Sequence, residues 1–87
     1  TIDTHITLGN LFRSRGEADR AAKIHQNLLA RPTLSSRQSS QVQLELARDF
    51  FHLGLHDRSE RLLQQLIRET QHDELRQAGK RLLAELL

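Results

Sequence analysis

The sequence predicts an all-α fold in which helical hairpins stack into a solenoid. The main evidence is an internal repeat, because residues 8–29 align without gaps on residues 46–67 at a constant offset of 38 positions. Repetition at a fixed interval of tens of residues is typical of solenoids, in which each unit buries its apolar face against its neighbours. Apolar residues also recur at helical spacing throughout the chain, and no stretch shows the alternation of a strand.

The two copies agree in the residues that shape a helical hairpin. Small residues, apolar residues and one charged pair recur at the same positions. The aligned pairs are Leu8 with Leu46, Gly9 with Ala47, Phe12 with Phe50, Gly16 with Gly54, Asp19-Arg20 with Asp57-Arg58, and Leu28 with Leu66.

The first hairpin is expected to join a helix over about residues 3–14 to a second helix that ends near residue 30. Gly9 lies inside the first helix, where glycine lowers helix stability, so we expect a close approach of the partner helix there. Gly16 is expected to end the first helix in the left-handed conformation, and Pro32 to follow the second. The expected caps are Thr1, Asp3 or Thr4, and the expected apolar faces are Ile6, Leu8, Leu11 and Phe12, then Ala21, Ile24 and Leu28.

The third helix is expected over about residues 36–52. Ser35 and Gln38 form a capping box at its start, and Gly54 ends it. The expected inward residues are Val42, Leu46 and Phe50, with Leu44, Phe51 and Leu53 on adjoining faces.

The fourth helix is expected to begin at a second capping box, formed by Asp57 and Glu60, and to continue to about residue 69. The fifth begins near residue 73 and presents Leu75, Ala78, Leu82, Leu83, Leu86 and Leu87. We therefore expect a single domain over residues 1–87, with repeats at about 2–34 and 36–71 and a half repeat at about 73–87. Since the sequence lacks methionine and ends without a polar tail, we expect it to be a piece of a longer protein.

Composition excludes several classes of protein. The formal net charge of +2 is too low for the electrostatic footprint of a nucleic-acid binder. The absence of cysteine excludes disulfides and cysteine-based metal sites, and no apolar run is long enough to span a bilayer.

The repeated positions resemble the tetratricopeptide repeat. Its small residues, the phenylalanine and the helix-ending glycine are all present in both copies. His5 stands where that family usually has tryptophan, His25 replaces an aromatic residue, and Ser59 replaces alanine. The resemblance implies about two and a half repeats, with the first helix of each hairpin lining a concave groove that binds a protein partner.

A narrower resemblance is carried by the stretches Asp3–Leu29 and Glu45–Leu66, which are similar to the repeat region of the lipopolysaccharide assembly protein B family of Gram-negative bacteria. That family is held to the inner membrane by an N-terminal helix, with cytoplasmic repeats and a C-terminal rubredoxin-like metal domain. The resemblance implies a cytoplasmic adaptor that promotes degradation of the lipid A deacetylase by the membrane protease FtsH. Neither the anchor nor the metal domain is present in this sequence, so no cofactor is expected here.

The groove positions of the tetratricopeptide family transfer to all three first helices. Together they would offer an apolar anchor, an amide and cations for carboxylates. They are Ile6, Asn10 and Arg13, then Leu44, Arg48, Phe51 and His52, and finally Arg81 and Glu85.

Catalytic and metal sites are not expected. His52 and His56 have the spacing of helical metal ligands, but Gly54 breaks the helix between them and no third ligand is evident. His5 and His25 occupy repeat-core positions, where packing or hydrogen bonding within the hairpin is the expected role. No serine lies in a nucleophile elbow, so we expect a protein that is not an enzyme.

Two alternatives to the adaptor remain open. The chain could be a generic tetratricopeptide scaffold that binds an extended peptide of unrelated function. It could also self-associate as a homodimer through an uncovered C-terminal helix face. That face comprises Leu82, Leu83, Leu86 and Leu87.

Overall fold

A computed structural model describes all of residues 1–87 as five α-helices without strands. The predictions of an all-α fold and of five helices are confirmed, and most helix ends lie within one or two residues of those expected. The helices are α1 (Ile2–Ser14), α2 (Ala18–Leu29), α3 (Ser36–His52), α4 (His56–Glu69) and α5 (Asp73–Leu86).

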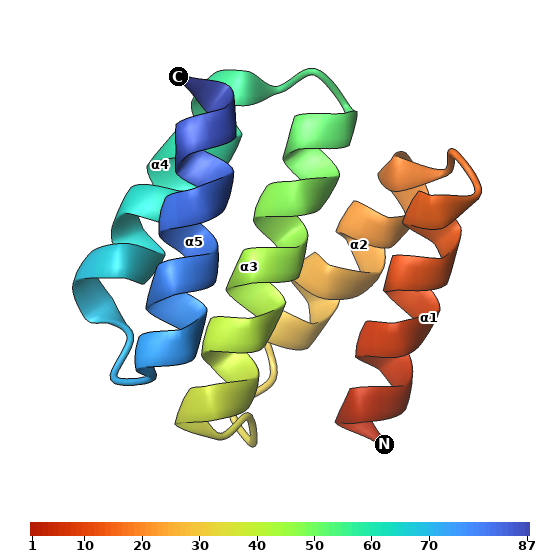
Figure 1. The fold of residues 1–87 in the computed structure, drawn as a ribbon. Coiled ribbons are helices and arrows are strands. Elements are labelled where there is room, and N and C mark those ends of the chain that lie inside the picture. Colours follow the sequence, from red (N-terminus) through yellow and green to blue (C-terminus); the bar gives the residue numbers. More distant parts are fainter.

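Each helix packs against the next one along the chain, so α1 with α2 and α3 with α4 form two successive hairpins. Figure 1 shows α1, α3 and α5 side by side at the front, with α2 and α4 behind them. Helix α3 also contacts both α1 and α5. The first helix of each hairpin therefore contributes to one common face.

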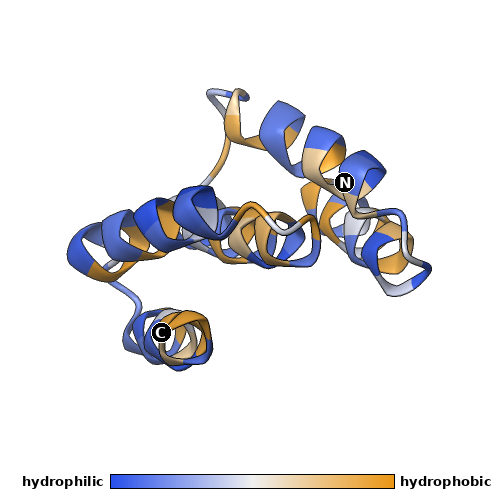
Figure 2. Ribbon diagram, turned by 90° about the horizontal axis from the view of Figure 1, so that it is seen from above, coloured by the Kyte–Doolittle hydropathy of each residue, from blue (hydrophilic) through white to orange (hydrophobic).

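The core is built from the inward sides of amphipathic helices. Figure 2 shows hydrophobic and hydrophilic sides on the helices when the molecule is viewed from above. One apolar cluster joins α3, α4 and α5, and two smaller clusters join α3 to the first hairpin. Val42, Leu63 and Leu66 are fully buried, as expected for the inner faces of α3 and α4.

Two glycines end α1 and α3 by the same turn. Gly16 and Gly54 have φ of +81° and +78°, a conformation that glycine adopts without steric cost. At Gly54, its own N–H donates to the Phe51 carbonyl at 3.1 Å, and the Leu55 N–H donates to the Phe50 carbonyl at 2.9 Å. This is the Schellman pattern, which satisfies the last carbonyls of the helix.

The caps were predicted correctly for α3 but not for α4. The Ser35 side chain accepts from the Gln38 N–H, and the Gln38 side chain accepts from the Ser35 N–H, so this capping box is confirmed. The expected box at Asp57 is wrong, because α4 begins at His56 and its N-cap, Leu55, makes no side-chain bond. The Schellman turn leads into α4 so directly that Asp57 already lies in its first turn.

Gly9 lies inside α1 at a point where the partner helix approaches closely, as the sequence predicted. A Cβ at this site would lie 2.4 Å from Nε2 of His25 and 2.8 Å from Cε1. The imidazole of α2 therefore occupies the space that any other residue would fill on α1. At the aligned position in the second hairpin, Ala47 is fully buried, and its carbonyl accepts a hydrogen bond from Ser59 Oγ at 2.8 Å.

The expected apolar face of α1 is only partly covered. Ile6 is buried, but Leu8 and Leu11 are 42% and 46% exposed, which corrects the prediction that they pack inward. Their aligned positions in α3, Leu46 and Asp49, are 5% and 0% exposed. The difference arises because α2 packs on that side of α3, whereas no helix packs on the corresponding side of α1.

The arginine of each repeated Asp-Arg pair lies over the phenylalanine ring of its own repeat. The guanidinium of Arg20 lies over the Phe12 ring at 5.9 Å, and that of Arg58 over the Phe50 ring at 4.5 Å. Cation–π contacts of this kind contribute about 0.5–1 kcal/mol at exposed sites. Each arginine thus shields the phenylalanine of its own repeat from water.

The first turns of α3 and α5 are joined by an exposed ion pair between Arg37 and Glu74. A hydrogen bond from the guanidinium, together with its charge, lowers the pKa of Glu74 from its ordinary value of 4.5. The same pairing raises the pKa of Arg37.

Replacing Glu74 with glutamine is therefore expected to lower the Tm slightly at neutral pH, and by less as the solution becomes more acidic. The pKa of Glu74 is lower in the folded than in the unfolded chain. Its carboxylate therefore stabilises the fold at any pH above the ordinary pKa of a glutamate. That contribution is lost as the pH falls through the lowered pKa. Thermal unfolding of both proteins at a series of pH values from 7 downward measures this, and a Tm difference that does not shrink as the pH falls below 4.5 would contradict it.

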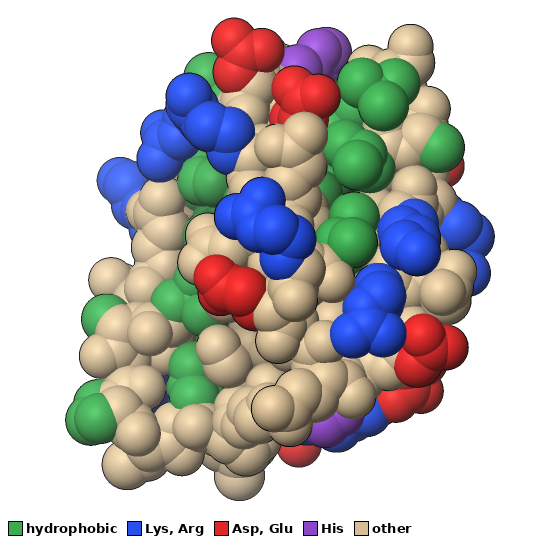
Figure 3. All heavy atoms as spheres, turned by 90° about the vertical axis from the view of Figure 1, so that its left-hand side faces the viewer, with side chains coloured by type: hydrophobic (Ala, Val, Ile, Leu, Met, Phe, Trp, Pro, Cys, Tyr) green, Lys and Arg blue, Asp and Glu red, His purple; other side chains and the backbone are tan.

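The face formed by α4 and α5 carries side chains of both charges (Figure 3). Figure 3 shows the face formed by α4 and α5, on which Lys and Arg side chains are interspersed with Asp and Glu. None of the five helices combines the length and apolar character that a bilayer crossing requires.

Candidate protein-binding groove

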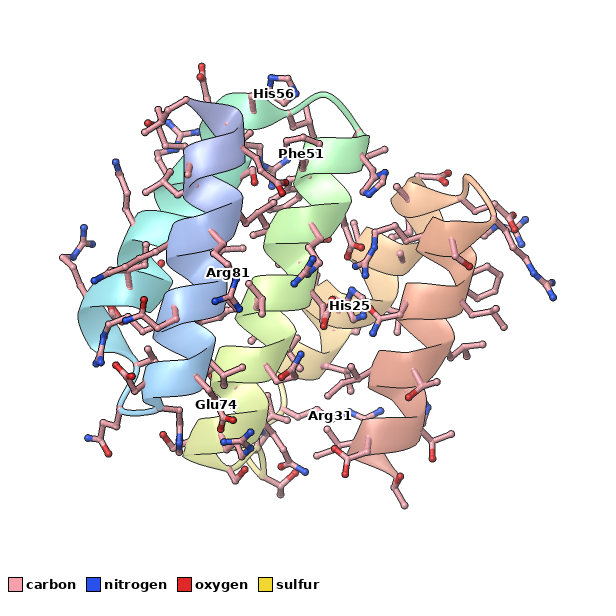
Figure 4. The ribbon with its side chains drawn as sticks, in the orientation of Figure 1. His25, Arg31, Phe51, His56, Glu74 and Arg81 are labelled. Atoms are coloured by element: carbon pink, nitrogen blue, oxygen red, sulfur yellow. The ribbon has the colours of Figure 1, made fainter.

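The candidate site is a hollow between α3 and α5 on the face that the first helices share. It consists of two adjoining concavities of about 180 Å³ and 150 Å³, both of which include Arg48, Leu82 and Glu85. We call this site the α3–α5 groove. Figure 4 shows Phe51 and Arg81 along it, with Arg81 at the side of α5 that faces α3. Its remaining lining residues are Arg13, Phe51, His52, Ala78 and Arg81.

The structure brings most of the predicted groove residues together. Six of them line the α3–α5 groove, namely Arg13, Arg48, Phe51, His52, Arg81 and Glu85. Leu44 does not, which corrects its prediction, because it is 2% exposed and belongs to the core that joins α3, α4 and α5. Ile6 is likewise buried. Asn10 lies outside the groove, and its side-chain oxygen is buried without a hydrogen-bond partner.

Arg13 lines the groove but is already paired. Its guanidinium donates to Glu45 Oε1 at 3.1 Å, to Asp49 Oδ1 at 3.0 Å and to the Glu45 carbonyl at 3.2 Å. Only 14% of its side chain is exposed. The guanidinium of Arg13 is therefore already engaged between α1 and α3. A second concavity, of about 390 Å³, lies between the N-terminal halves of α1 and α3 and is lined mostly by polar residues. Most of the predicted groove residues gather instead between α3 and α5.

The ion pair at Asp49 extends inward to His25. Asp49 Oδ2 lies 2.5 Å from Nδ1 of His25, and both side chains are fully buried. Nε2 of the same ring lies 3.3 Å from the Ile6 carbonyl. One carboxylate thus joins α1, α2 and α3. His25 is packed and hydrogen-bonded as predicted, but its main partner comes from the next hairpin.

Between the second hairpin and α5, apolar side chains replace this charged network. Residues 13 and 25 align with Phe51 and Leu63, at an offset of 38, and residues 45 and 49 align with Leu82 and Leu86, at an offset of 37. These four side chains belong to one apolar cluster. The exchange is visible when the repeats are aligned, but only the structure reveals that the aligned residues contact one another.

The cations that remain in the groove are only partly neutralised. Arg81 is exposed and has no ion-pair or hydrogen-bond partner. Arg48 makes one contact, from Nε to Glu45 Oε1 at 3.4 Å, and its side chain is 41% exposed. The Glu45 carboxylate is shared with Arg13 and with Gln41 Nε2 at 2.7 Å, so it is not available to Arg48 alone. Glu85, one turn beyond Arg81, is also exposed.

Aromatic rings gather at the end of the groove. The Phe51 ring centroid lies 6.0 Å from that of His52 and 5.5 Å from that of His56. Phe51 is half-buried against the core, so it offers one side to solvent. His5 is exposed, and its Nδ1 donates to the Thr1 carbonyl at 2.7 Å, which corrects its expected place in the repeat core.

The C-terminal helix exposes less apolar surface than expected for self-association. Leu82 is 6% exposed, and Leu83 and Leu86 pack against the core. Only Leu87 is largely exposed, at 86%. The four leucines therefore do not form a continuous open face.

Comparison with known proteins links the chain to a named protein. No family model matches the chain. It is 49% identical over 70 residues, 80% of the chain, to lipopolysaccharide assembly protein B of Escherichia coli (strain K12). It is 46% identical over 73 residues, 84% of the chain, to the protein of the same name from Haemophilus influenzae. The chain spans about 18% of the length of each relative. The resemblance predicted from the sequence is confirmed: this chain is similar to one segment of lipopolysaccharide assembly protein B.

Proposed function

We propose that the chain is a non-catalytic protein-binding module of a regulator of lipopolysaccharide synthesis, and that the α3–α5 groove is its binding surface. The observation that carries the proposal is the convergence of six expected ligand-binding side chains on one hollow. A mostly polar groove that also contains Phe51, Ala78 and Leu82 fits the chemistry of a peptide site, where an anchor residue gives affinity and charged pairs give orientation.

In the whole protein, the module would belong to a tetratricopeptide-type array at the cytoplasmic face of the inner membrane. There it would help present the lipid A deacetylase to the membrane protease FtsH. The similarity to lipopolysaccharide assembly protein B supports this role. The groove supports the part of it that concerns partner binding.

The test is a pull-down with the affinity-tagged, full-length parent protein from bacterial membranes. Wild type is compared with Arg81→Glu in the groove and with Arg68→Glu, the same exchange at an exposed position of α4 outside the groove. We expect wild type and Arg68→Glu to retain the protease and the deacetylase, and Arg81→Glu to lose one of them at unchanged helicity.

Two results would contradict the proposal in different ways. If Arg81→Glu retains both partners, the groove is not the binding surface. If wild type captures neither the protease nor the deacetylase, the regulatory role fails and the generic peptide-binding scaffold is the better description.

A further inference from the structure

We infer that the buried pair of His25 and Asp49 keeps a proton that a histidine in water gives up near neutral pH, and that the docking of the first hairpin on α3 therefore depends on pH. His25 lies where α1, α2 and α3 meet (Figure 4). It does not line the α3–α5 groove, so the proposal is independent of the function proposed for that groove.

Both nitrogens of the His25 ring face atoms that accept hydrogen bonds. Nε2 lies 3.3 Å from the Ile6 carbonyl oxygen, which has no proton to give, so Nε2 donates. Nδ1 lies 2.5 Å from Asp49 Oδ2. The other oxygen of Asp49 accepts from the Arg13 guanidinium at 3.0 Å, as an ionised carboxylate does. Nδ1 therefore donates as well, and a ring that donates at both nitrogens is an imidazolium.

A neutral ring would leave two buried lone pairs facing each other. With the proton on Nδ1 alone, the lone pair of Nε2 would face the Ile6 carbonyl oxygen. With the proton on Nε2 alone, the lone pair of Nδ1 would face the Asp49 carboxylate at 2.5 Å. Since the side chains of His25 and Asp49 are fully buried, solvent does not screen these atoms. Either neutral form therefore carries the cost of an unsatisfied buried polar group.

The charges around the ring also favour the imidazolium. Helix α3 contributes two carboxylates, Glu45 and Asp49, and α1 contributes one guanidinium, that of Arg13. With His25 protonated, these four side chains have no net charge, whereas a neutral ring leaves one negative charge in excess. Arg48 approaches Glu45 at 3.4 Å, but its side chain is 41% exposed, so water screens its charge.

The corresponding contact between the second hairpin and α5 holds no such proton. The residues aligned with the four members of the network are apolar and belong to one cluster. They are Phe51, Leu63, Leu82 and Leu86. The two contacts between successive repeats therefore differ in their response to pH, and only the first one contains a titratable group at these positions.

The extra proton links folding to pH. Above about pH 6.5 an exposed histidine is mostly neutral, so the folded chain binds one more proton than the unfolded chain. Stability falls with rising pH wherever the folded state holds the extra proton, and for one proton the folding equilibrium constant falls by up to about tenfold per pH unit. Because Asp49 bonds both Arg13 of α1 and His25 of α2, loss of the proton weakens the docking of the first hairpin on α3.

The first test is NMR of the imidazole nitrogens in the ¹⁵N-labelled 87-residue chain at about pH 7.5. We expect both nitrogens of His25 to have the chemical shifts of protonated nitrogens. The exposed His5, His52 and His56 are internal references and should show the averaged shifts of neutral rings.

The second test compares urea unfolding of the wild type with that of Arg13→Phe/His25→Leu/Glu45→Leu/Asp49→Leu, in which the network has its apolar counterparts. Both proteins are unfolded at several values from about pH 6.5 to about pH 8.5. We expect the folding equilibrium constant of the wild type to fall with rising pH, approaching tenfold per pH unit, and that of the variant to change far less.

Two outcomes would overturn the proposal. One is an unprotonated ring nitrogen on His25 at about pH 7.5, and the other is an equal pH dependence of unfolding in the two proteins. The NMR measurement is made on the wild type, so it remains decisive if the fourfold variant does not fold.

Discussion

Replacing Asp49 with alanine is expected to lower the free energy of unfolding by about 3–5 kcal/mol, because it leaves two polar groups without their partner. Asp49 is fully buried and bonds both Arg13 at 3.0 Å and His25 at 2.5 Å. A domain of this size is stable by roughly 5–15 kcal/mol or less, so the change removes a large share of the total. Urea unfolding followed by far-UV circular dichroism measures the loss.

Asp57→Ala is the matched control, since Asp57 is exposed in the first turn of α4. Its removal should cost about 0.3–1 kcal/mol through the helix dipole. If the two variants lose the same free energy of unfolding, Asp49 does not stabilise the fold through the buried network.

The apolar counterparts in the second hairpin and α5 suggest a variant that should restore the stability lost in Asp49→Ala. Changing residues 13, 25, 45 and 49 to their aligned counterparts gives the combined variant Arg13→Phe/His25→Leu/Glu45→Leu/Asp49→Leu. A fully apolar substitute for a buried charge network is often neutral or stabilising, whereas removal of one member is not. We expect this variant to be more stable than Asp49→Ala.

Gly9→Ala is expected to lower the free energy of unfolding by about 1–3 kcal/mol, although alanine is the better helix former by about 1 kcal/mol. The added Cβ would lie 2.4 Å from Nε2 of His25, whose ring is held by Asp49. Moving the ring would relieve the clash only by lengthening that buried bond. Thermal and urea unfolding measure the effect.

Gly79→Ala is the control for this substitution. Gly79 also lies inside a helix and is buried, but its Cβ would meet Ile67 and Leu66 at an ordinary 3.4 Å. This change should be neutral or should stabilise the chain by up to about 1 kcal/mol. The background His25→Leu should remove the penalty at Gly9, because the second hairpin packs Ala47 and Leu63 in one cluster. An unchanged penalty in that background would refute the clash with His25.

Much of the candidate site could be predicted from sequence alone. Helical periodicity and the repeat together place Arg48, Phe51, His52, Arg81 and Glu85 on one face, and these five residues do line the groove. The prediction that Leu44 lines the groove was wrong. Helical periodicity places a residue on a face of its helix, but it does not say how far the neighbouring helix covers that face. Arg13 lines the groove as predicted, but its ion pairs with Glu45 and Asp49 could not be predicted from the sequence.

The sequence by itself determined the hairpins and their ends. These depend on local interactions: apolar spacing along one helix, the Ser35 capping box, and the glycines 38 positions apart that adopt positive φ. Tertiary structure alone decided which polar groups are satisfied internally and which remain free for a partner. Arg13 and Glu45 are 32 residues apart in the sequence. Contacts across that separation depend on how two hairpins dock, and docking is set by the shape of the whole core rather than by any short stretch of sequence.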